Sequence, residues 1–190
     1  MRLGIFGGTF NPIHTGHLIL AECAREQFVL DQVLFIPTAT PPHKSSRDLL
    51  PGRERLRLIR LAIRGHRAFR ASDLELRRSG VSYSLDTVRQ LHARYPTAKL
   101  FFLVGSDMLR VRWYGLRELT RLCTFVVAPR VSPPRARRFR GMRKLVMPQV
   151  EISSSMIRAR VRAGKSVRYL VPEAVVREIR RRRLFRGGGG

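Results

Sequence analysis

The most constraining feature of this sequence is a short apolar run near its start that ends at two glycines. Residues 2–6 form the run, Gly7 and Gly8 follow it, and after residues 9–12 a long segment with apolar residues close to helical spacing begins. This order predicts a strand, a glycine turn and the N-terminus of a helix. In an open α/β sheet, the carboxyl end of a strand faces the crevice where ligands bind. We therefore expect a ligand site at this turn.

The residues of this turn are suited to phosphate. Glycines let a ligand approach the backbone closely, and a helix N-terminus offers unpaired N–H groups with a partial positive charge. His14 and His17 stand three residues apart, so both imidazoles can face one anion from the same helical turn. Two other interpretations stay open. The glycines can form a plain tight turn, and the histidines can be metal ligands, although no third ligand stands at a supporting spacing.

Neither of the two common phosphate-binding motifs is present. The turn matches neither G-x-G-x-x-G nor the P-loop pattern. Gly164-Lys165-Ser166 resembles the end of a P-loop, but Ala159 stands where the first glycine is required and no predicted strand precedes it. We therefore exclude a P-loop site.

Residues 7–17, GGTFNPIHTGH, resemble the signature of the nucleotidylyltransferases that carry a His-x-Gly-His motif. In that superfamily the histidines bind the α- to γ-phosphates of ATP and stabilise the transition state of adenylyl transfer. The resemblance implies catalytic roles for His14 and His17. The implied ATP-binding residues of this turn are His14 and His17 together with Gly7, Gly8, Thr9 and Phe10. The family usually has Asp at the position of Asn11, which the resemblance places among the residues that bind the acceptor.

Two segments resemble the acceptor site of one branch of this superfamily, the bacterial nicotinate mononucleotide adenylyltransferases. Pro-Pro-His-Lys at residues 41–44 resembles the loop that holds the mononucleotide phosphate, through His43 and Lys44. On residue types alone, a plain surface loop with one lysine is the commoner interpretation. Ser-Tyr-Ser-Leu-Asp-Thr at residues 82–87 resembles the segment that helps to hold the pyridine carboxylate, with Ser84 where the family has Thr. Without the resemblance, its hydroxyl groups would indicate only a helix cap.

A single tryptophan provides the third acceptor signature. Trp113 is followed directly by Tyr114. An isolated tryptophan most often packs in a core or between helices. The resemblance implies instead that this aromatic pair stacks on the pyridine ring and supplies a backbone amide to its carboxylate. A flat π-surface suits a flat heteroaromatic ligand.

Two further segments complete the ATP site that the resemblance implies. A Gly-Ser-Asp turn follows a strongly apolar run over residues 99–104, and the family places its Gly105 and Asp107 beside the ribose and adenine. Ile-Ser-Ser-Ser-Met-Ile-Arg at residues 152–158 resembles the second nucleotide motif. Serines at a helix start usually only cap it, but here we expect N–H groups, hydroxyls and the guanidinium of Arg158 to converge on one anion site. The implied ATP ligands are Ile152, Ser154, Ser155 and Arg158, and the last is also implied to be catalytic.

The remaining pattern predicts an α/β chain. Helical spacing predicts helices between the predicted strands, which cover residues 33–36, 69–73, 99–104 and 125–127 and a last edge strand over 145–147. One of these helices, residues 53–64, is expected to place leucines and isoleucines inward and arginines outward. The first helix is expected over residues 18–30. We expect an open, mostly parallel sheet with Rossmann-like topology and helices on both faces.

Length and composition predict one domain. The 190 residues suffice for one core, and 44% hydrophobic and 27% charged residues are ordinary for a globular protein. We expect a single domain over residues 1–186 and a disordered glycine tail over 187–190. No apolar run is long enough to span a bilayer and the chain enters a strand directly, so we expect a cytoplasmic protein without a signal peptide. Cys23 and Cys123 are expected to be small buried thiols of a reducing compartment.

The net charge of +25 raises nucleic-acid binding as a hypothesis. The cations are spread over almost every segment, and only four of the 38 are lysines, which favours a general bias toward arginine over a designed patch. The sequence has no zinc-finger pattern and no aromatic RNA-binding signature, and its only localised basic helix covers residues 177–186. A basic nucleic-acid-binding module stays open as the alternative from a different class.

The resemblance therefore predicts transfer of the adenylyl group of ATP to nicotinate mononucleotide. The products would be nicotinic acid adenine dinucleotide and pyrophosphate, in the synthesis of NAD. Mg²⁺ is expected on the substrate phosphates, with few protein ligands. Nicotinamide mononucleotide and phosphopantetheine are the alternative acceptors, and a homo-oligomer is compatible with the sequence.

Overall fold

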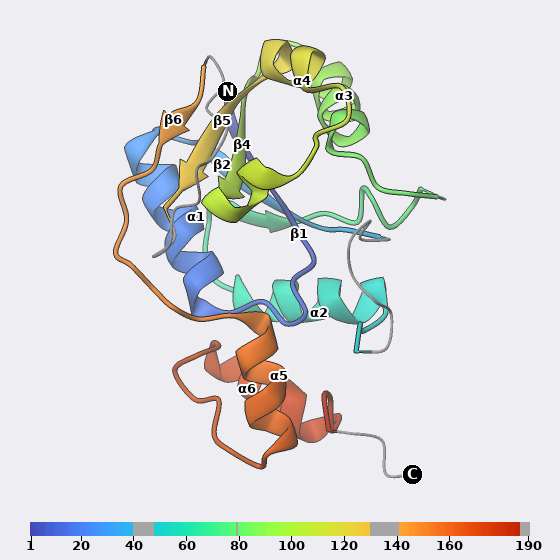
Figure 1. Cartoon of the computed structure of the whole chain (residues 1–190), viewed down its shortest axis with the longest axis vertical. Coiled ribbons are helices and arrows are strands. Elements are labelled where there is room, and N and C mark those ends of the chain that lie inside the picture. The colour runs from blue at the N-terminus through green and yellow to red at the C-terminus, as the bar shows by residue number, and fades with distance from the viewer. Residues whose placement is uncertain (40–47, 79, 130–140, 187–190) are drawn as a thin grey trace.

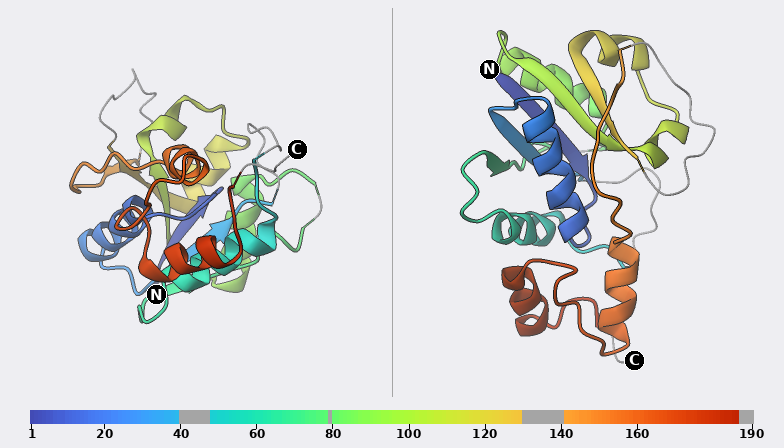
Figure 2. Two further views of the ribbon diagram at one scale, coloured as in Figure 1. Left: turned by 90° about the horizontal axis from the view of Figure 1, so that it is seen from below. Right: turned by 90° about the vertical axis from the view of Figure 1, so that its left-hand side faces the viewer.

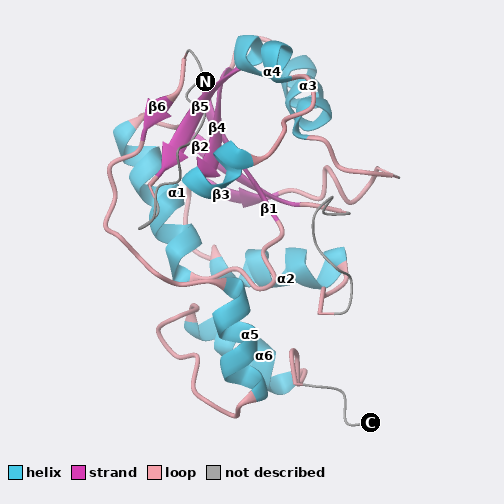
Figure 3. Ribbon diagram, in the orientation of Figure 1, coloured by secondary structure: helices cyan, strands magenta, loops and turns pink. Residues whose placement is uncertain are grey.

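The computed structural model of the chain describes residues 1–39, 48–78, 80–129 and 141–186. Within these residues, a sheet of six parallel strands lies in the order β3-β2-β1-β4-β5-β6 (Figure 3). The strands are β1 (Arg2–Gly8), β2 (Gln32–Pro37), β3 (Phe69–Ala71), β4 (Lys99–Gly105), β5 (Cys123–Ala128) and β6 (Arg143–Lys144). This order and the parallel pairing confirm the expected Rossmann-like α/β fold.

Strand β1 lies in the middle of the sheet, between β2 and β4. From β1 the chain order runs through β2 to β3 on one side, and on the other side it runs from β4 through β5 to β6. The strand order therefore reverses between β1 and β4, and ligands of such sheets bind in the crevice at the carboxyl ends of the two strands. Gly7 and Gly8 are the last residues of β1, so the glycine turn opens on this crevice.

The sheet carries a hydrophobic cluster on each face. Side chains alternate along β4, where Phe101 and Leu103 belong to one cluster and Phe102 and Val104 to the other. Helices α1 (Thr15–Gln27) and α2 (Gly52–Ala62) cover the first face, and α3 (Ser84–Arg94) and α4 (Leu116–Leu122) cover the second (Figure 1, Figure 2). Because both faces are buried, the strands read as continuous apolar runs in the sequence.

Two C-terminal helices, α5 (Ser154–Arg162) and α6 (Glu173–Arg181), lie beyond the carboxyl ends of the strands, at the bottom of Figure 1. Buried Ile157 of α5 and Val176 of α6 belong to the same hydrophobic cluster as α1 and α2. An ion pair of 2.8 Å between Arg57 and Glu178 also joins α2 to α6. The C-terminal helices are thus packed next to the turn that follows β1.

The last strand and the first helix differ from the sequence prediction. Strand β6 covers Arg143–Lys144, and the predicted strand over residues 145–147 is wrong, because the Val146 N–H donates to the side chain of Gln27 at 2.8 Å. The Leu145 N–H still donates to the carbonyl of Val127 in β5 at 2.9 Å, and its side chain is buried in the core. The first helix begins at Thr15 and ends at Gln27, three residues earlier than expected at each end, with His14 as its N-cap residue.

The arginines of α2 do not all point outward, as the sequence pattern suggested. Arg55 is 1% exposed and lies in the same buried row as Leu58 and Ile59. Residues three and four apart share one face of a helix. The charged side chain therefore points into the molecule, where hydropathy alone predicts an outward direction.

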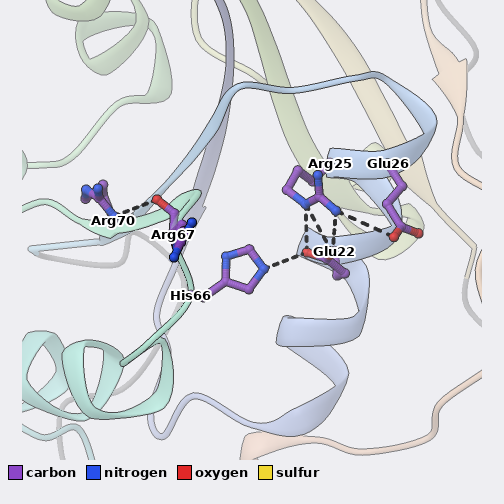
Figure 4. Close-up of polar contacts among 6 residues, drawn as sticks. All are labelled: Glu22, Arg25, Glu26, His66, Arg67 and Arg70. Carbon is purple, nitrogen blue, oxygen red and sulfur yellow. Dashed lines mark hydrogen bonds and ion pairs between the residues drawn. The ribbon is translucent and has the colours of Figure 1, made fainter.

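Polar contacts join α1 to the segment before β3 (Figure 4). Glu22 accepts a hydrogen bond of 2.6 Å from Arg25, and its other oxygen lies 3.0 Å from Nε2 of His66. The His66 ring stacks on Phe69, with the centroids 3.6 Å apart. The hydrogen bond from Arg25 is the main reason why the pKa of Glu22 lies below its ordinary value. These contacts hold the edge of the sheet against the first helix.

The two cysteines are free thiols. Cys123, the first residue of β5, is buried as expected, and this burial raises the pKa of its thiol to about 12. Cys23 in α1 is only partly buried. In the described part of the chain, no helix combines the length and the apolar character needed to cross a membrane.

Candidate active site

The carboxyl ends of β1 and β4 open into a cavity of about 900 Å³. Its walls come from the turn after β1, the start of α1, the start of α3, the 3-10 helix η1 (Ser106–Arg110) and the segment before α5. The predicted site residues that line it are Gly7, Gly8, Thr9, Phe10, His14, His17, Ser84, Gly105, Asp107, Trp113, Tyr114 and Ile152. Small-molecule ligands occupy cavities of this size. The structure thus brings most residues of the predicted ATP and acceptor sites to one cavity.

Two histidines form the part of the cavity wall at the start of α1. His14 is the N-cap residue and His17 lies in the first turn. The backbone N–H of His14 donates to Nδ1 of His17 at 3.2 Å, and the two rings stack with their centroids 3.6 Å apart. Because Nδ1 accepts this bond, the proton of a neutral His17 ring belongs on Nε2. Nε2 is then a hydrogen-bond donor, which suits a phosphate oxygen.

Neighbouring rings and glycines fix these histidines. Phe6 and Phe10 meet the His17 ring edge-on, at centroid distances of 5.8 and 5.0 Å. A Cβ atom at Gly8 would lie 3.0 Å from the Phe10 ring, and one at Gly16 would lie 3.2 Å from Nδ1 of His14. A side chain at either position would therefore displace a ring of the site.

Another part of the cavity wall is aromatic. Trp113 donates its indole N–H to the carbonyl oxygen of Met108 at 3.0 Å. Its ring meets Phe102 and Phe125 edge-on, at centroid distances of 5.7 and 5.4 Å. The neighbouring Tyr114 is 61% exposed. Trp113 is thus anchored on the core, as an isolated tryptophan usually is, and also lines the cavity.

The start of α3 brings backbone donors to the same cavity. Ser84 is the first residue of this helix of 11 residues, and Tyr83 is its N-cap. N–H groups in the first turn of a helix have no partner within the helix, and they attract anions. The Tyr83 ring lies against that of Tyr114, with the centroids 4.8 Å apart. A carboxylate held near both rings would therefore be within reach of a helix N-terminus.

The chain matches proteins of known family over most of its length. Residues 5–160 match the model of the cytidylyltransferase-like family. A relative from Synechococcus sp. (strain JA-3-3Ab), named "Probable nicotinate-nucleotide adenylyltransferase", is 43% identical over 97% of this chain and 94% of its own length. A relative of the same name from Shouchella clausii is 42% identical over 97% of this chain and 96% of its own. This chain belongs to the nicotinate-nucleotide adenylyltransferase family.

A solved structure extends this result to the fold. The nicotinic acid mononucleotide adenylyltransferase of Plasmodium falciparum, complexed with NaAD, superposes with a TM-score of 0.81 over 97% of each chain. The sequence identity is 17%, so the likeness concerns the fold. The open parallel sheet described above is therefore one that this family of adenylyltransferases shares with distant proteins.

Among the described residues, four that family resemblance placed in the substrate sites do not line the cavity: Asn11, Ser154, Ser155 and Arg158. Arg158 donates to the backbone carbonyl of Asn11 at 2.9 Å, and its other terminal nitrogen lies 3.5 Å from the hydroxyl of Ser155. Ser154 donates to the carbonyl of Pro12 at 2.8 Å. In the structure these side chains hold α5 against the turn after β1. Direct contacts with ATP from Ser154, Ser155 and Arg158 stay predictions.

Asn11 is buried, and both ends of its side-chain amide are occupied. Its nitrogen donates to the carbonyl of Asp48 at 2.7 Å, and its oxygen accepts from the N–H of Leu50 at 3.1 Å. A direct role in acceptor binding stays a prediction. His43 and Lys44, expected to hold the acceptor phosphate, lie outside the described residues.

Two buried ionisable side chains, one at the cavity and one behind it, were missed by sequence reasoning. Glu75 lines the cavity, is buried, and accepts a hydrogen bond of 2.8 Å from the hydroxyl of Thr87. Burial raises the pKa of Glu75 above its ordinary value. Arg55 lies behind the glycine turn and donates to the carbonyl of Thr9. Both residues stand in charged stretches of the sequence, and no pattern of spacing separates them from surface charges.

Proposed function

We propose that this chain transfers the adenylyl group of ATP to nicotinate mononucleotide, which gives nicotinic acid adenine dinucleotide and pyrophosphate in the synthesis of NAD. The names of its relatives support the reaction. The observation that carries the proposal is that one cavity joins the His14–His17 turn, suited to a triphosphate, with Trp113 and the start of α3, suited to an aromatic carboxylate.

The reaction needs no protein nucleophile. An anionic phosphate oxygen of the acceptor attacks the α-phosphorus of ATP, and the bond from that phosphorus to the pyrophosphate oxygen breaks. Catalysis then consists of positioning and of stabilising the charge that develops on the phosphate oxygens. We assign this stabilisation to His14 and His17, with Arg158 contributing from the second turn of α5. The Nε2–H of His17 would donate to a phosphate oxygen without any proton leaving the ring.

Mg²⁺ would enter this site with the triphosphate. In the described chain, no group of three or more His, Cys, Asp or Glu side chains could hold a metal. The nitrogen donors of His14 and His17 do not suit Mg²⁺, which prefers oxygen ligands and keeps several waters. These residues therefore fit a metal that is held by substrate phosphates. When bound, Mg²⁺ neutralises charge on the leaving pyrophosphate.

The acceptor should be nicotinate rather than nicotinamide mononucleotide. The two differ by a carboxylate against a neutral amide. A site with backbone donors from the Ser84 and Tyr114 regions pairs with both carboxylate oxygens, whereas the NH₂ of the amide would face donors and stay unpaired. Leaving a buried polar group unpaired costs about 1–3 kcal/mol. We expect a preference of roughly tenfold or more in kcat/KM. Equal values for the two acceptors would overturn this selectivity while leaving adenylyl transfer intact.

One assay tests the function. Pyrophosphate release from ATP is measured with nicotinate mononucleotide, nicotinamide mononucleotide and phosphopantetheine, and the dinucleotide product is identified by mass spectrometry. We expect turnover with nicotinate mononucleotide above the other two. Absence of pyrophosphate release with every acceptor, together with gel-shift binding of nucleic acid that persists at physiological salt, would replace the proposal by a nucleic-acid-binding function.

A further inference from the structure

Arg55 of α2 is one of the most buried side chains of the molecule, although it carries a charge. Its exposed fraction is 1%. Nε donates to the carbonyl of Leu50 at 2.9 Å, one terminal nitrogen donates to the carbonyl of Thr9 at 2.8 Å, and the other donates to the carbonyl of Thr38 at 2.7 Å. The last nitrogen also lies 3.4 Å from the carbonyl of Ala39. A single guanidinium thus holds three separate segments together.

Two of these three segments meet at the active-site cavity, and the third lies behind it. Thr9 belongs to the glycine turn and Thr38 follows β2, and both residues line the cavity. Leu50 precedes α2. Along the sequence, the stretch from Thr38 to Leu50 contains His43 and Lys44, the expected ligands of the acceptor phosphate. Arg55 therefore joins the glycine turn at Thr9 to Thr38 and Leu50, the described residues on each side of the stretch that contains His43 and Lys44.

Asn11 strengthens the same junction. Its amide donates to the carbonyl of Asp48 and accepts from the N–H of Leu50, so Leu50 is bonded at its nitrogen by Asn11 and at its oxygen by Arg55. A carboxylate at position 11 could accept from Leu50 but could not donate to Asp48. The asparagine thus completes the fastening of residues 48–50 to the glycine turn.

Burying the charge of Arg55 costs free energy that an apolar side chain at the same position would not cost. Within the described residues, each hydrogen bond of the Arg55 guanidinium goes to a backbone carbonyl. Burial lowers its pKa, and the nearby Glu75 carboxylate partly counters this effect. Apolar side chains of similar volume usually serve stability as well as a buried charge does. A planar fork of donors, however, can hold several carbonyls at fixed separations, which no apolar side chain does.

We propose that Arg55 is a positioning residue for adenylyl transfer, which sets the spacing between the glycine turn at Thr9 and the chain at Thr38 and Leu50. This inference rests on the proposed function. In-line attack requires the acceptor oxygen to lie about 3–3.5 Å from the α-phosphorus, and a displacement of about 1 Å can cost roughly 10²-fold in rate. Arg55 acts only through the backbones of Thr9, Thr38 and Leu50.

The first test compares Arg55→Lys with Arg53→Lys, a matched change at an exposed position of the same helix. A lysine ammonium cannot hold all three carbonyls in the geometry of the guanidinium. We expect kcat/KM for nicotinate mononucleotide to fall about 10²-fold in Arg55→Lys. The dissociation constant for ATP, measured by calorimetry without acceptor, should change less than about threefold, as for a surface substitution. Arg53→Lys should leave both quantities unchanged.

A second variant covers the case in which Arg55→Lys does not fold. Arg55→Ala is assayed with added ethylguanidinium, and with ethylammonium as the control cation. We expect ethylguanidinium alone to restore kcat/KM by about tenfold, because it can re-enter the cavity left by the side chain and bond the same carbonyls.

Three results would overturn the inference. These are wild-type kcat/KM in Arg55→Lys, an equal loss of ATP affinity and of kcat/KM, and failure of both variants to fold with or without ethylguanidinium. The last two would mark Arg55 as a residue of general stability. A wild-type protein that releases no pyrophosphate with nicotinate mononucleotide would instead contradict the proposed function, before any variant is compared.

Discussion

At the scale of single residues, the proposed chemistry depends on which ring nitrogen of His17 can donate. The backbone N–H of His14 engages Nδ1, so the donor of the neutral ring is Nε2. Negative charge on the phosphate oxygens grows as the bond to pyrophosphate breaks. A fixed donor at that place stabilises the transition state more than bound ATP, which is the condition for raising kcat.

Replacing His17 by Ala should therefore lower kcat by about 10²–10³-fold, the usual cost of one preorganised donor. KM for nicotinate mononucleotide should change much less, because the imidazole is assigned to the triphosphate. Steady-state kinetics with each substrate varied in turn measure both effects. His66→Ala is the matched control, since His66 contacts Glu22 and not the cavity. A kcat within about threefold of wild type would remove His17 from the reaction.

We expect the buried carboxyl of Glu75 to make the free energy of unfolding depend on pH. Burial is the largest influence on its pKa and raises it above the ordinary value. A raised pKa means that the folded state holds this proton at pH values where the unfolded chain has released it. The stabilisation that this group contributes is therefore fully present at pH values below the ordinary pKa of Glu. It is lost as the pH rises through the pKa of Glu75 in the folded state. In Glu75→Gln this pH dependence should disappear, while the hydrogen bond from Thr87 is kept.

Urea unfolding at a series of pH values measures this difference. Wild type should lose free energy of unfolding relative to Glu75→Gln as the pH rises above the ordinary range of Glu. Glu26→Gln, at a position of α1 that is 67% exposed, controls for the loss of one carboxylate at the surface. A constant difference between wild type and Glu75→Gln at all pH values would contradict the shifted titration.

At the scale of elements, the sequence predicted those parts of the fold that depend on continuous apolar runs. The strands β1, β2, β4 and β5 are such runs because both faces of the sheet are covered. The short strand β6 could not be predicted, because its two residues, Arg143 and Lys144, are charged and exposed and pair only by backbone. Hydropathy patterns do not register such pairing.

Some residues of the candidate site could likewise be predicted from the sequence, and others could not. Motif resemblance located the His14–His17 turn and Trp113, whose residue types are tied to their chemistry. It could not locate Arg55, because its partners are backbone carbonyls that any sequence provides. Likewise, no residue type signals that Glu75 is buried, since its partner Thr87 stands 12 residues away. Such contacts become visible only when distant segments are placed in space.

The start of α4 lies directly after the aromatic pair of the cavity wall. Gly115 is the N-cap of α4, directly after Tyr114, and has a φ of 64°, in the left-handed region. A Cβ atom there would collide with the side chain of Leu85 on α3. Gly115→Ala should therefore push α4 and the aromatic pair away from α3. We expect a loss of about 1–3 kcal/mol in the free energy of unfolding and a raised KM for nicotinate mononucleotide, with a smaller change for ATP.

The matched control for this substitution is Gly164→Ala. Gly164 has a φ of 67°, but a Cβ atom there would meet nothing within 4 Å. This variant carries only the cost of placing alanine in the left-handed region, about 1–2 kcal/mol. If the two variants lose equal stability and keep equal KM values, the contact between Gly115 and Leu85 does not position the aromatic pair.

At the scale of the whole molecule, α5 and α6 share a hydrophobic cluster with the sheet and its first helices. We infer that residues 1–186 fold as one cooperative domain.

The net positive charge is also a property of the whole molecule. A net charge of +25 raises the local concentration of anionic nucleotides, and both expected substrates are anionic.

Ile179→Ala tests this cooperativity. Ile179 of α6 is 3% exposed and packs in the shared cluster, so truncation should cost about 2–5 kcal/mol. Urea unfolding is followed by circular dichroism and by the fluorescence of Trp113, which lies on the other face of the sheet. Both signals should shift by the same amount, while Val146→Ala at an exposed position should shift neither. An unchanged tryptophan transition would mean that the C-terminal helices unfold as a separate unit.

The hydrogen bond between the His14 N–H and Nδ1 of His17 has a further consequence, which concerns acid. A ring nitrogen cannot both accept this hydrogen bond and carry a proton of its own. Full protonation of His17 to imidazolium therefore displaces the His14 N–H and leaves one more donor unsatisfied at the start of α1. The proton that would give His17 a positive charge therefore removes the hydrogen bond between the two histidines, and that bond is available only to the neutral ring.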